Sequence, residues 1–456
     1  ELSRFLAGYI KELMFHLLAR FLVVASAAVL IYSNTFHNPF VFDDLPFILE
    51  NSAIRDFSSF LNFSSSRYVT FLTFAINYFL GGYNTIGYHI FNLAVHILNA
   101  ILVYWFVMLT LRTPCFGMRI ADYGINPKSI NPFTYLPLFA ALIFVSHPVQ
   151  TQAVTYIYQR SASLATMFYL LAVAMYINFR LWVIGNRLKV KSSTHHLSPV
   201  TYYLLSLLSA VLAMKTKEIA FTLPFIIVLY EVLFFEKAPK LRRVLYLLPF
   251  ILTLLIIPLS ILGPEIGFIK HGIEVDGTLG KEQMWNLRAD PGATLSRYEY
   301  LLTEFRVIAT YLRLLFLPVN QNLLYDYPVF SSFLNPQVFL SALFLLFIFG
   351  VACYLLYRSR SSVQDAGCRM HALRPAPYLR LVAFGIFWFF ITLSVESSII
   401  PLKRDVIFEH RLYLPSVGII MALSAALFRL FTHSPSRFAA LLLGCSVALI
   451  ITFSFT

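Results

Sequence analysis

Two adjacent aspartates near the start of the chain are the residues best suited to chemistry. Asp43 and Asp44 end the segment Asn38–Asp44 (NPFVFDD), a few residues after the first apolar stretch. Carboxylates beside a membrane surface are costly to desolvate, which favours a functional role over an ordinary solvated loop. One carboxylate could take the proton of an attacking hydroxyl as a general base, while the other orients the nucleophile or binds a cation. The alternative is that the pair caps a short helix from Leu45.

Cationic side chains in two later segments could hold a phosphate group. Arg160 ends the segment that begins at His147, and Lys217 precedes Glu218 in another short turn. The planar guanidinium of an arginine makes bidentate contacts with phosphate, and a lysine offers a point charge. Any lysine or arginine at a membrane interface can instead extend to lipid headgroups, so this alternative stays open.

A third segment, late in the chain, is dense in ionisable side chains beside two apolar stretches. So many charges next to apolar helices are hard to explain as an ordinary solvated loop, and their number favours a binding or catalytic role. Seven ionisable residues fall within sixteen positions: Glu396, Lys403, Arg404, Asp405, Glu409, His410 and Arg411.

Polar residues also recur within one apolar stretch. His89, Asn92, His96 and Asn99 follow one another at steps of three, four and three, so they lie on one face of a helix. Hydrogen bonds between helices are the favoured interpretation, and the alternative has His89 touching the active site. The two histidines are two turns apart, too far to share a metal ion.

The sequence indicates no resident cofactor. The four cysteines have neither paired spacing nor a histidine partner at zinc-site spacing. Glycine-rich phosphate loops, serine-hydrolase elbows and zincin motifs are also missing. A divalent metal ion is possible but not indicated.

Composition places most of the chain in a membrane. Of its 456 residues, 59% are hydrophobic and 12% are charged, against about 25% charged in soluble domains. Apolar runs of about 20 residues, the length that crosses a bilayer, recur along the chain. The net charge of +13 fits basic cytoplasmic loops better than nucleic-acid binding, which we do not expect. The predicted fold class is therefore an all-α polytopic membrane protein.

The apolar runs predict about eleven transmembrane helices, the first retained as a helix and not cleaved as a signal peptide. An odd number of spans puts the two chain ends on opposite sides. The predicted spans are Leu13–Tyr32, Ile90–Leu111, Phe133–Val145, Ala162–Ile184, Val200–Met214, Ile219–Phe235, Val244–Leu262, Val338–Tyr357, Leu381–Val395, Leu412–Leu430 and Phe438–Phe455.

Basic residues predict an N-terminus on the inside, because lysine and arginine accumulate in short cytoplasmic loops. With that orientation the carboxylates gather outside, in loops 33–89, 263–337 and 396–411. The basic inner positions are Arg112, Arg119, Lys128, Arg187, Lys189, Lys191, Lys237, Lys240, Arg242, Arg243, Arg358, Arg360, Arg369, Arg374 and Arg380.

The segment Tyr298–Leu317 is long enough to span, yet counting it as a span would turn a basic loop outward. Its polar residues gather on one helical face and leave an apolar face opposite. We therefore predict a helix at the outer interface with its polar face beside a groove, and a similar helix at Tyr68–Leu80. The polar face consists of Glu299, Thr303, Arg306, Thr310 and Arg313.

Six segments, in order along the chain, resemble the bacterial relatives of the transmembrane and tetratricopeptide-repeat O-mannosyltransferases, within the GT-C class of glycosyltransferases. They are Asn38–Asp44 (NPFVFDD), Arg67–Thr73 (RYVTFLT), Tyr88–Ala100 (YHIFNLAVHILNA), His147–Arg160 (HPVQTQAVTYIYQR), Lys217–Pro224 (KEIAFTLP) and Phe408–Gly418 (FEHRLYLPSVG).

The resemblance implies a GT-C transmembrane catalytic domain over residues 1–456, followed outside by a tetratricopeptide-repeat domain that this chain lacks. The donor is a sugar on a polyprenyl-phosphate lipid, and the acceptor is a hydroxyl, expected to be a protein serine or threonine. The family points to a bacterial inner membrane with the site facing the periplasm, or alternatively to an endoplasmic reticulum membrane with a lumenal site.

By the same resemblance Asp43 or Asp44 is the catalytic base. One displacement at the anomeric carbon then inverts its configuration. Candidates for holding the departing phosphate are Arg160, Lys217, Arg306 and Arg411, where Arg306 rests on the polar face described above. Supporting or substrate-binding candidates are His89, His147, Glu218, Glu409 and His410.

Two other functions compete with this one. A related transferase could glycosylate a lipid or a glycan in place of a protein. A transporter or flippase for the lipid-linked sugar would need charges along a path through the membrane, whereas the acids here gather at one face.

Overall fold

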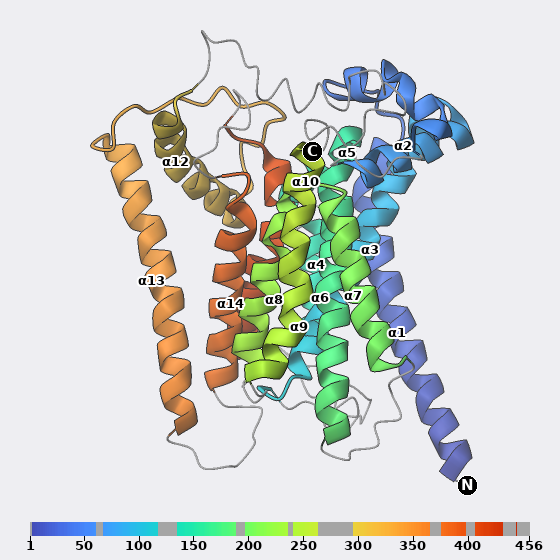
Figure 1. Cartoon of the computed structure of the whole chain (residues 1–456), viewed down its shortest axis with the longest axis vertical. Helices are drawn as coiled ribbons and strands as arrows, with labels where there is room; N and C mark the ends of the chain where they lie inside the picture. The colour runs from blue at the N-terminus through green and yellow to red at the C-terminus, as the bar shows by residue number, and fades with distance from the viewer. Residues whose placement is uncertain are drawn as a thin grey trace.

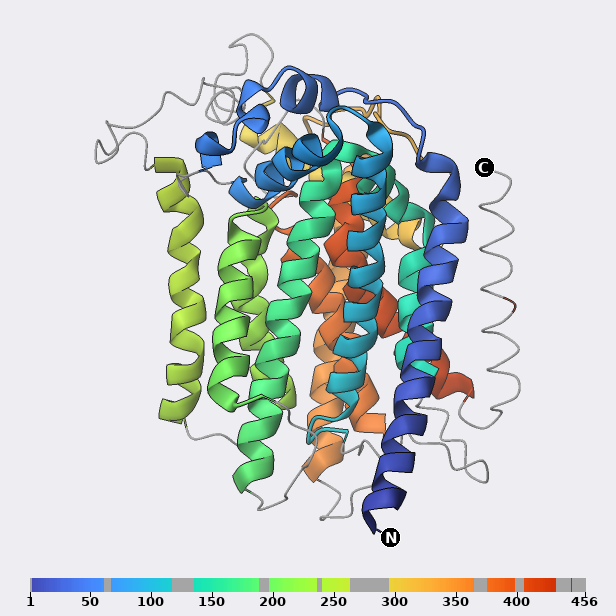
Figure 2. The ribbon, with the colours of Figure 1, turned by 90° about the vertical axis from the view of Figure 1, so that its right-hand side faces the viewer.

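The computed structural model describes residues 2–60, 67–116, 135–187, 197–235, 240–262, 295–364, 375–397, 406–431 and 444. Every regular element within these residues is a helix, and most of the helices run side by side as one bundle (Figures 1 and 2). The predicted all-α polytopic membrane architecture is confirmed.

The helices match the predicted spans closely. Each predicted span as far as Leu412–Leu430 coincides with described helices, Val244–Leu262 with the consecutive α9 and α10. Phe133 and Thr134 lie outside the described residues, and so does Phe438–Phe455 apart from residue 444. The helices are α1 (Leu2–Tyr32), α2 (Tyr68–Gly81), α3 (Thr85–Leu111), α4 (Leu136–Ser146), α5 (Thr151–Thr155), α6 (Arg160–Arg187), α7 (Pro199–Met214), α8 (Leu223–Phe234), α9 (Lys240–Leu252), α10 (Ile256–Leu262), α12 (Arg297–Phe316), α13 (Pro336–Gln364), α14 (Pro375–Leu393) and α15 (Tyr413–Phe431).

Fewer helices than predicted meet the length that a full crossing needs. Within the described residues, six are long and apolar enough by themselves: Phe15–Thr35, Thr85–Leu111, Ile157–Gly185, Leu241–Ser260, Pro336–Arg360 and Glu409–Leu427. A pair bent by 56°, Leu136–Ser146 and Pro148–Thr155, makes a seventh if it counts as one span. The number eleven therefore stays a prediction.

The two ends of the bundle differ. The N-terminus lies at one end, together with the C-terminal ends of α6 and α13 (Figure 1). The loop between α1 and α2, called the first loop, covers the other end together with α12 (Figure 2). We call this second end the loop end.

Part of the charge segregation predicted from the sequence falls outside the described residues. Positions that the structure does not describe include seven of the basic residues and six acids of the predicted outer loops: Arg119, Lys128, Lys189, Lys191, Lys237, Arg369, Arg374, Glu265, Glu274, Asp276, Glu282, Asp290 and Asp405.

The start and the end of helix α12 are both determined by its local sequence. Ser296 and Glu299 make reciprocal hydrogen bonds with each other's backbone N–H, which satisfies free donors at the helix start. The residue before Pro318 cannot easily remain helical, and the helix ends at Phe316. The predicted helix at Tyr298–Leu317 is thereby confirmed, and it is not among the helices that meet the crossing criteria.

Helices α14 and α15 pack backbone against backbone. A Cβ built on Gly418 would lie 2.7 Å from the Cβ of Trp388, a distance that real Cβ atoms essentially never show. Gly385 faces Gly418 across the same contact. Because α15 directly follows Glu409–Leu412, this contact also fixes the position of the last ionisable segment.

Candidate functional site

Asp44 is held in the fold by main-chain donors. Its side chain is fully buried, and its two oxygens accept the backbone N–H groups of Val41 at 3.0 Å and of Tyr158 at 2.7 Å. Burial raises the pKa of the Asp44 carboxyl to about 7, while the two N–H groups oppose that shift. Asp44 thus ties the first loop to the segment before α6.

Asp43 occupies a more open position than its neighbour. It is half-buried, and its backbone N–H donates to the hydroxyl of Tyr156 at 2.8 Å. The residue before it, Phe42, has a φ of 46°, in the left-handed region that bulky residues rarely adopt. Such strain persists only where surrounding contacts enforce it.

Arg67 connects the first loop to the Lys217 turn, although the sequence pattern alone assigned it no role. Its guanidinium pairs with both carboxylate oxygens of Glu218 at 3.3 Å and donates to the Tyr158 hydroxyl at 2.8 Å. Since the Tyr158 backbone holds Asp44, one arginine joins two predicted site segments. The signal that could have found it is its place at the start of the matched segment RYVTFLT.

Lys217 and Arg411 each meet a buried carboxylate. The Lys217 ammonium lies 2.7 Å from Glu396, and both side chains are buried. The Arg411 guanidinium lies 3.9 Å from Glu304, too far for a hydrogen bond but close enough for strong attraction in a buried setting. Glu304 and Glu396 also influence each other electrostatically.

These residues make three ion pairs, Arg67–Glu218, Lys217–Glu396 and Glu304–Arg411, which we together call the charge network; Lys217 and Glu218 are adjacent in sequence, and the Glu396 carboxylate acts electrostatically on Glu304. Burial lowers the pKa of the Lys217 ammonium, and the Glu396 carboxylate opposes that shift. Burial likewise raises the pKa of Glu304 to about 7, and Arg411 opposes it. A buried cation attracts any nearby negative charge strongly, because little water is present to screen it. An anionic ligand can therefore replace the carboxylate as its partner.

Helix α12 supports the network with the face that the sequence pattern marks as apolar. Tyr300 donates to the backbone carbonyl of Glu396 at 3.0 Å, and Tyr311 to that of Phe408 at 2.9 Å, on the side of the helix that carries Glu304. The predicted polar face instead contacts the chain after the helix, as Thr303 accepts the Phe330 N–H at 3.1 Å. A groove does lie beside this face, as predicted, because Arg306 lines a groove between α12 and α13, but that groove is on the side of α12 away from Glu304.

Arg160 is fully buried and surrounded by acceptors. It donates to the Asn92 side chain at 2.6 Å, to Thr73 at 3.3 Å and to the Tyr88 carbonyl at 3.0 Å, and it lies over the ring of Phe91. With its donors engaged in this way, Arg160 joins α2, α3 and α6. We therefore leave it out of the phosphate-binding candidates.

The polar face of α3 forms hydrogen bonds between helices, as predicted. Asn92 holds Arg160, His96 contacts the Tyr413 hydroxyl at 2.7 Å, and Asn99 donates to the Ser163 carbonyl at 2.8 Å. At the loop end, the His89 ring contacts the Asn38 carbonyl at 3.1 Å and so steadies the start of the first loop.

The remaining supporting candidates fix the last segment and its neighbours. The His147 ring contacts the Leu315 carbonyl at 3.0 Å, and the His410 N–H donates to the Gln152 side chain at 2.6 Å. Glu409 accepts hydrogen bonds from Gln321 at 2.6 Å and from the Asn322 N–H at 3.0 Å. These contacts position the loop end, while Lys403, Arg404 and Asp405 lie outside the described residues.

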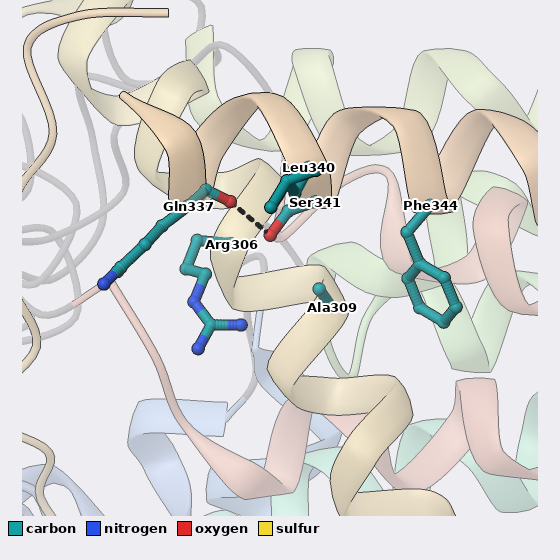
Figure 3. Close-up of a pocket in the computed structure, with 6 residues that line it drawn as sticks. All are labelled: Arg306, Ala309, Gln337, Leu340, Ser341 and Phe344. Atoms are coloured by element: carbon teal, nitrogen blue, oxygen red, sulfur yellow. Dashed lines mark hydrogen bonds between the residues drawn. The ribbon is translucent and has the colours of Figure 1, made fainter. Parts of the chain in front are cut away.

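Arg306 does not join the network. It is two residues from Glu304 on α12, so the two side chains leave the helix in nearly opposite directions. Arg306 faces α13 across a groove (Figure 3). In the described part of the chain, no three histidine, cysteine or carboxylate side chains are grouped as metal ligands.

Comparison with known proteins points to one family of enzymes. The chain is 25% identical to "Protein O-mannosyl-transferase TMTC4" of Homo sapiens over 461 residues, which is 93% of this chain and 57% of the relative. The relatives are protein O-mannosyl-transferases. TMTC4 of Mus musculus is 30% identical over 46% of this chain and 29% of its own length. Tmtc3 of Drosophila melanogaster is 29% identical over 35% of this chain and 19% of its own length.

The resemblance to O-mannosyltransferases predicted from six short segments is thereby confirmed. The chain spans little more than half the length of the human relative, 57%. No protein-family model and no solved structure matches it.

Proposed function

We propose that this protein is a membrane glycosyltransferase that moves a hexose, mannose by analogy with its relatives, from a polyprenyl-phosphate lipid to a protein serine or threonine. The observation that carries the proposal is that the charge network places two buried cations at the same end of the membrane bundle as the aspartates of the first loop, where Arg67 contacts Tyr158, the residue whose N–H holds Asp44. A phosphate leaving group needs cations, and a hydroxyl nucleophile needs a base.

Asp43 is the proposed base. Both oxygens of Asp44 hold main-chain N–H groups, whereas the half-buried Asp43 carboxylate can face an incoming hydroxyl. In the reaction the hydroxyl proton passes to Asp43, the hydroxyl oxygen bonds the anomeric carbon, and the bond from that carbon to the phosphate oxygen breaks. One displacement from the opposite side inverts the configuration.

Lys217 and Arg411 are the proposed phosphate ligands. Each is buried and each has a buried carboxylate as its ion-pair partner, Glu396 for Lys217 and Glu304 for Arg411. A phosphate entering between them would take up part of their charge, and a low-dielectric setting strengthens that attraction as negative charge develops on the leaving oxygen. No metal ion is required by this scheme.

The proposed membrane is the bacterial inner membrane, with the loop end facing the periplasm and a tetratricopeptide-repeat domain after the membrane domain. The alternative is the endoplasmic reticulum membrane with a lumenal loop end. In either case the sugar lipid stays in the bilayer while its headgroup reaches the aspartates.

The decisive experiment supplies the purified protein, in lipid nanodiscs, with radiolabelled polyprenyl-phosphate mannose. The acceptors are a serine- and threonine-rich polypeptide or a membrane lipid extract. We expect label on the polypeptide, with an anomeric configuration opposite to that of the donor. Label on lipid alone, or movement of the donor between leaflets without transfer, would rule out the proposal.

A further inference from the structure

A groove separate from the charge network lies between α12 and α13 (Figure 3), and α12 lies at the loop end (Figure 1). Its volume is about 380 Å³, and it is lined by Arg306, Ala309, Gln337, Leu340, Ser341 and Phe344. Because Arg306 and Glu304 leave α12 in nearly opposite directions, a ligand in this groove is separated from Arg411 by the helix itself.

The polar end of the groove suits an anion. Arg306 is the one charged residue of the lining, and no described residue accepts a hydrogen bond from its guanidinium. Figure 3 shows Arg306 and Gln337 toward one end of the groove and Phe344 toward the other. Ser341 donates its own hydroxyl to the Gln337 carbonyl at 2.7 Å, which leaves Arg306 and the Gln337 amide as donors for a ligand.

The other end of the groove continues into an apolar row on α13. Leu340, Phe344 and Phe347 follow at steps of four and three, and they are 63%, 46% and 69% exposed. Helix α13 stands at the edge of the bundle (Figure 1). In a bilayer this row faces hydrocarbon, together with the flanking Leu343 and Leu346, which are 47% and 66% exposed, so a lipid chain can lie along it.

We propose that this groove is a holding site for a polyprenyl phosphate. Arg306 and Gln337 bind the phosphate, and one prenyl chain lies along Leu340, Phe344 and Phe347. The identity of the lipid rests on the proposed function. The site would hold the carrier lipid beside the catalytic network, before the sugar is transferred or after the lipid is released.

The test is crosslinking of a polyprenyl phosphate that carries a diazirine near its phosphate, using the full chain in nanodiscs, with the crosslinked peptide identified by mass spectrometry. We expect crosslinks within residues 336–347. Arg306→Gln should weaken them about tenfold or more, the loss expected when charge-assisted hydrogen bonds are removed. Ala309→Trp should have a similar effect by filling the groove. Arg297→Gln, which removes an exposed charge from the same helix, should have none.

Competition separates the sources of phosphate. Unlabelled polyprenyl phosphate should abolish the crosslink, whereas equal amounts of phosphatidylglycerol or inorganic phosphate should not. Crosslinking that survives Arg306→Gln, or that phosphatidylglycerol removes equally well, would overturn the inference.

The two proposals fail independently. Asp43→Asn should stop transfer and leave the α13 crosslink unchanged. Transfer of sugar without any α13 crosslink would count against the groove alone. An intact crosslink in a protein that transfers no sugar to any acceptor would count against the proposed function alone.

Discussion

At the scale of single residues, the adjacent aspartates have different environments although they are chemically identical. Both oxygens of Asp44 are used by main-chain donors, while Asp43 is half-buried beside Tyr156. Asp44 therefore has a structural role in this fold, and Asp43 is available to a substrate. Each aspartate accordingly carries its own prediction.

Replacing the base should remove activity without affecting the fold. Asp43→Asn should lower the transfer rate by about 10²-fold or more, the usual contribution of a general base, with an unchanged melting temperature. Asp56→Asn is the matched control, because Asp56 is an exposed carboxylate of the same loop. Equal rates in the two variants would remove Asp43 from the mechanism.

Replacing Asp44 should change how stability depends on pH. Its pKa is about 7 in the folded protein against 3.8 as the ordinary value, so folding favours the protonated acid. The stabilisation is complete below the unfolded pKa and is lost as pH rises through the folded pKa. The amide of Asp44→Asn does not titrate, and it accepts only one of the two N–H groups well.

We therefore expect Asp44→Asn to melt below wild type, with a gap that is widest near pH 5 and narrower near pH 8. Melting curves by scanning fluorimetry across that range would measure the gap. A gap that stays constant with pH would mean that Asp44 does not titrate in this window.

At the scale of elements, the direct contact of α14 with α15 determines where the last ionisable segment lies. A methyl group on Gly418 would collide with Trp388 and with the Gly385 backbone. Gly350 on α13 has no atom within 4 Å of the position that a Cβ would take, so a methyl group there meets open space. The same substitution should therefore be destabilising at Gly418 and harmless at Gly350.

Gly418→Ala should destabilise the protein by about 1–3 kcal/mol, because an overpacked helix contact must separate. Gly350→Ala should be neutral or slightly stabilising, by up to about 1 kcal/mol, since alanine favours a helix. Melting temperatures of the two variants in the same detergent compare them directly. Equal shifts in both would show that the α14–α15 contact tolerates a side chain.

At the scale of the whole molecule, the proposed chemistry depends on which side of the membrane the loop end faces. Ser52 lies in the first loop and Arg360 near the far end of α13, and both are exposed. In a cysteine-free background, we expect Ser52→Cys to react with a membrane-impermeant maleimide in intact cells. Arg360→Cys should react only after permeabilisation. The reverse pattern would place the aspartates in the cytosol and end the proposed function.

Much of this molecule follows from local rules that the sequence expresses by itself. Apolar length determines the helices, since a bilayer core demands about 20 apolar residues, and nearly every predicted span coincides with a helix. Periodicity was enough to predict hydrogen bonds from His96 and Asn99 to neighbouring helices. The capping box at Ser296 likewise marks the start of α12.

The tertiary structure alone decided which polar residues work together. Arg160 and Lys217 look alike in sequence, yet Arg160 donates to main-chain and side-chain acceptors of α2 and α3, and Lys217 pairs with the Glu396 carboxylate. Arg67, Glu304 and Glu396 enter the network through partners 90 or more positions away, with Glu396 179 positions from Lys217. Local patterns determine which face of a helix is polar. They do not determine which distant segment will meet that face, because this depends on how all the helices pack at once.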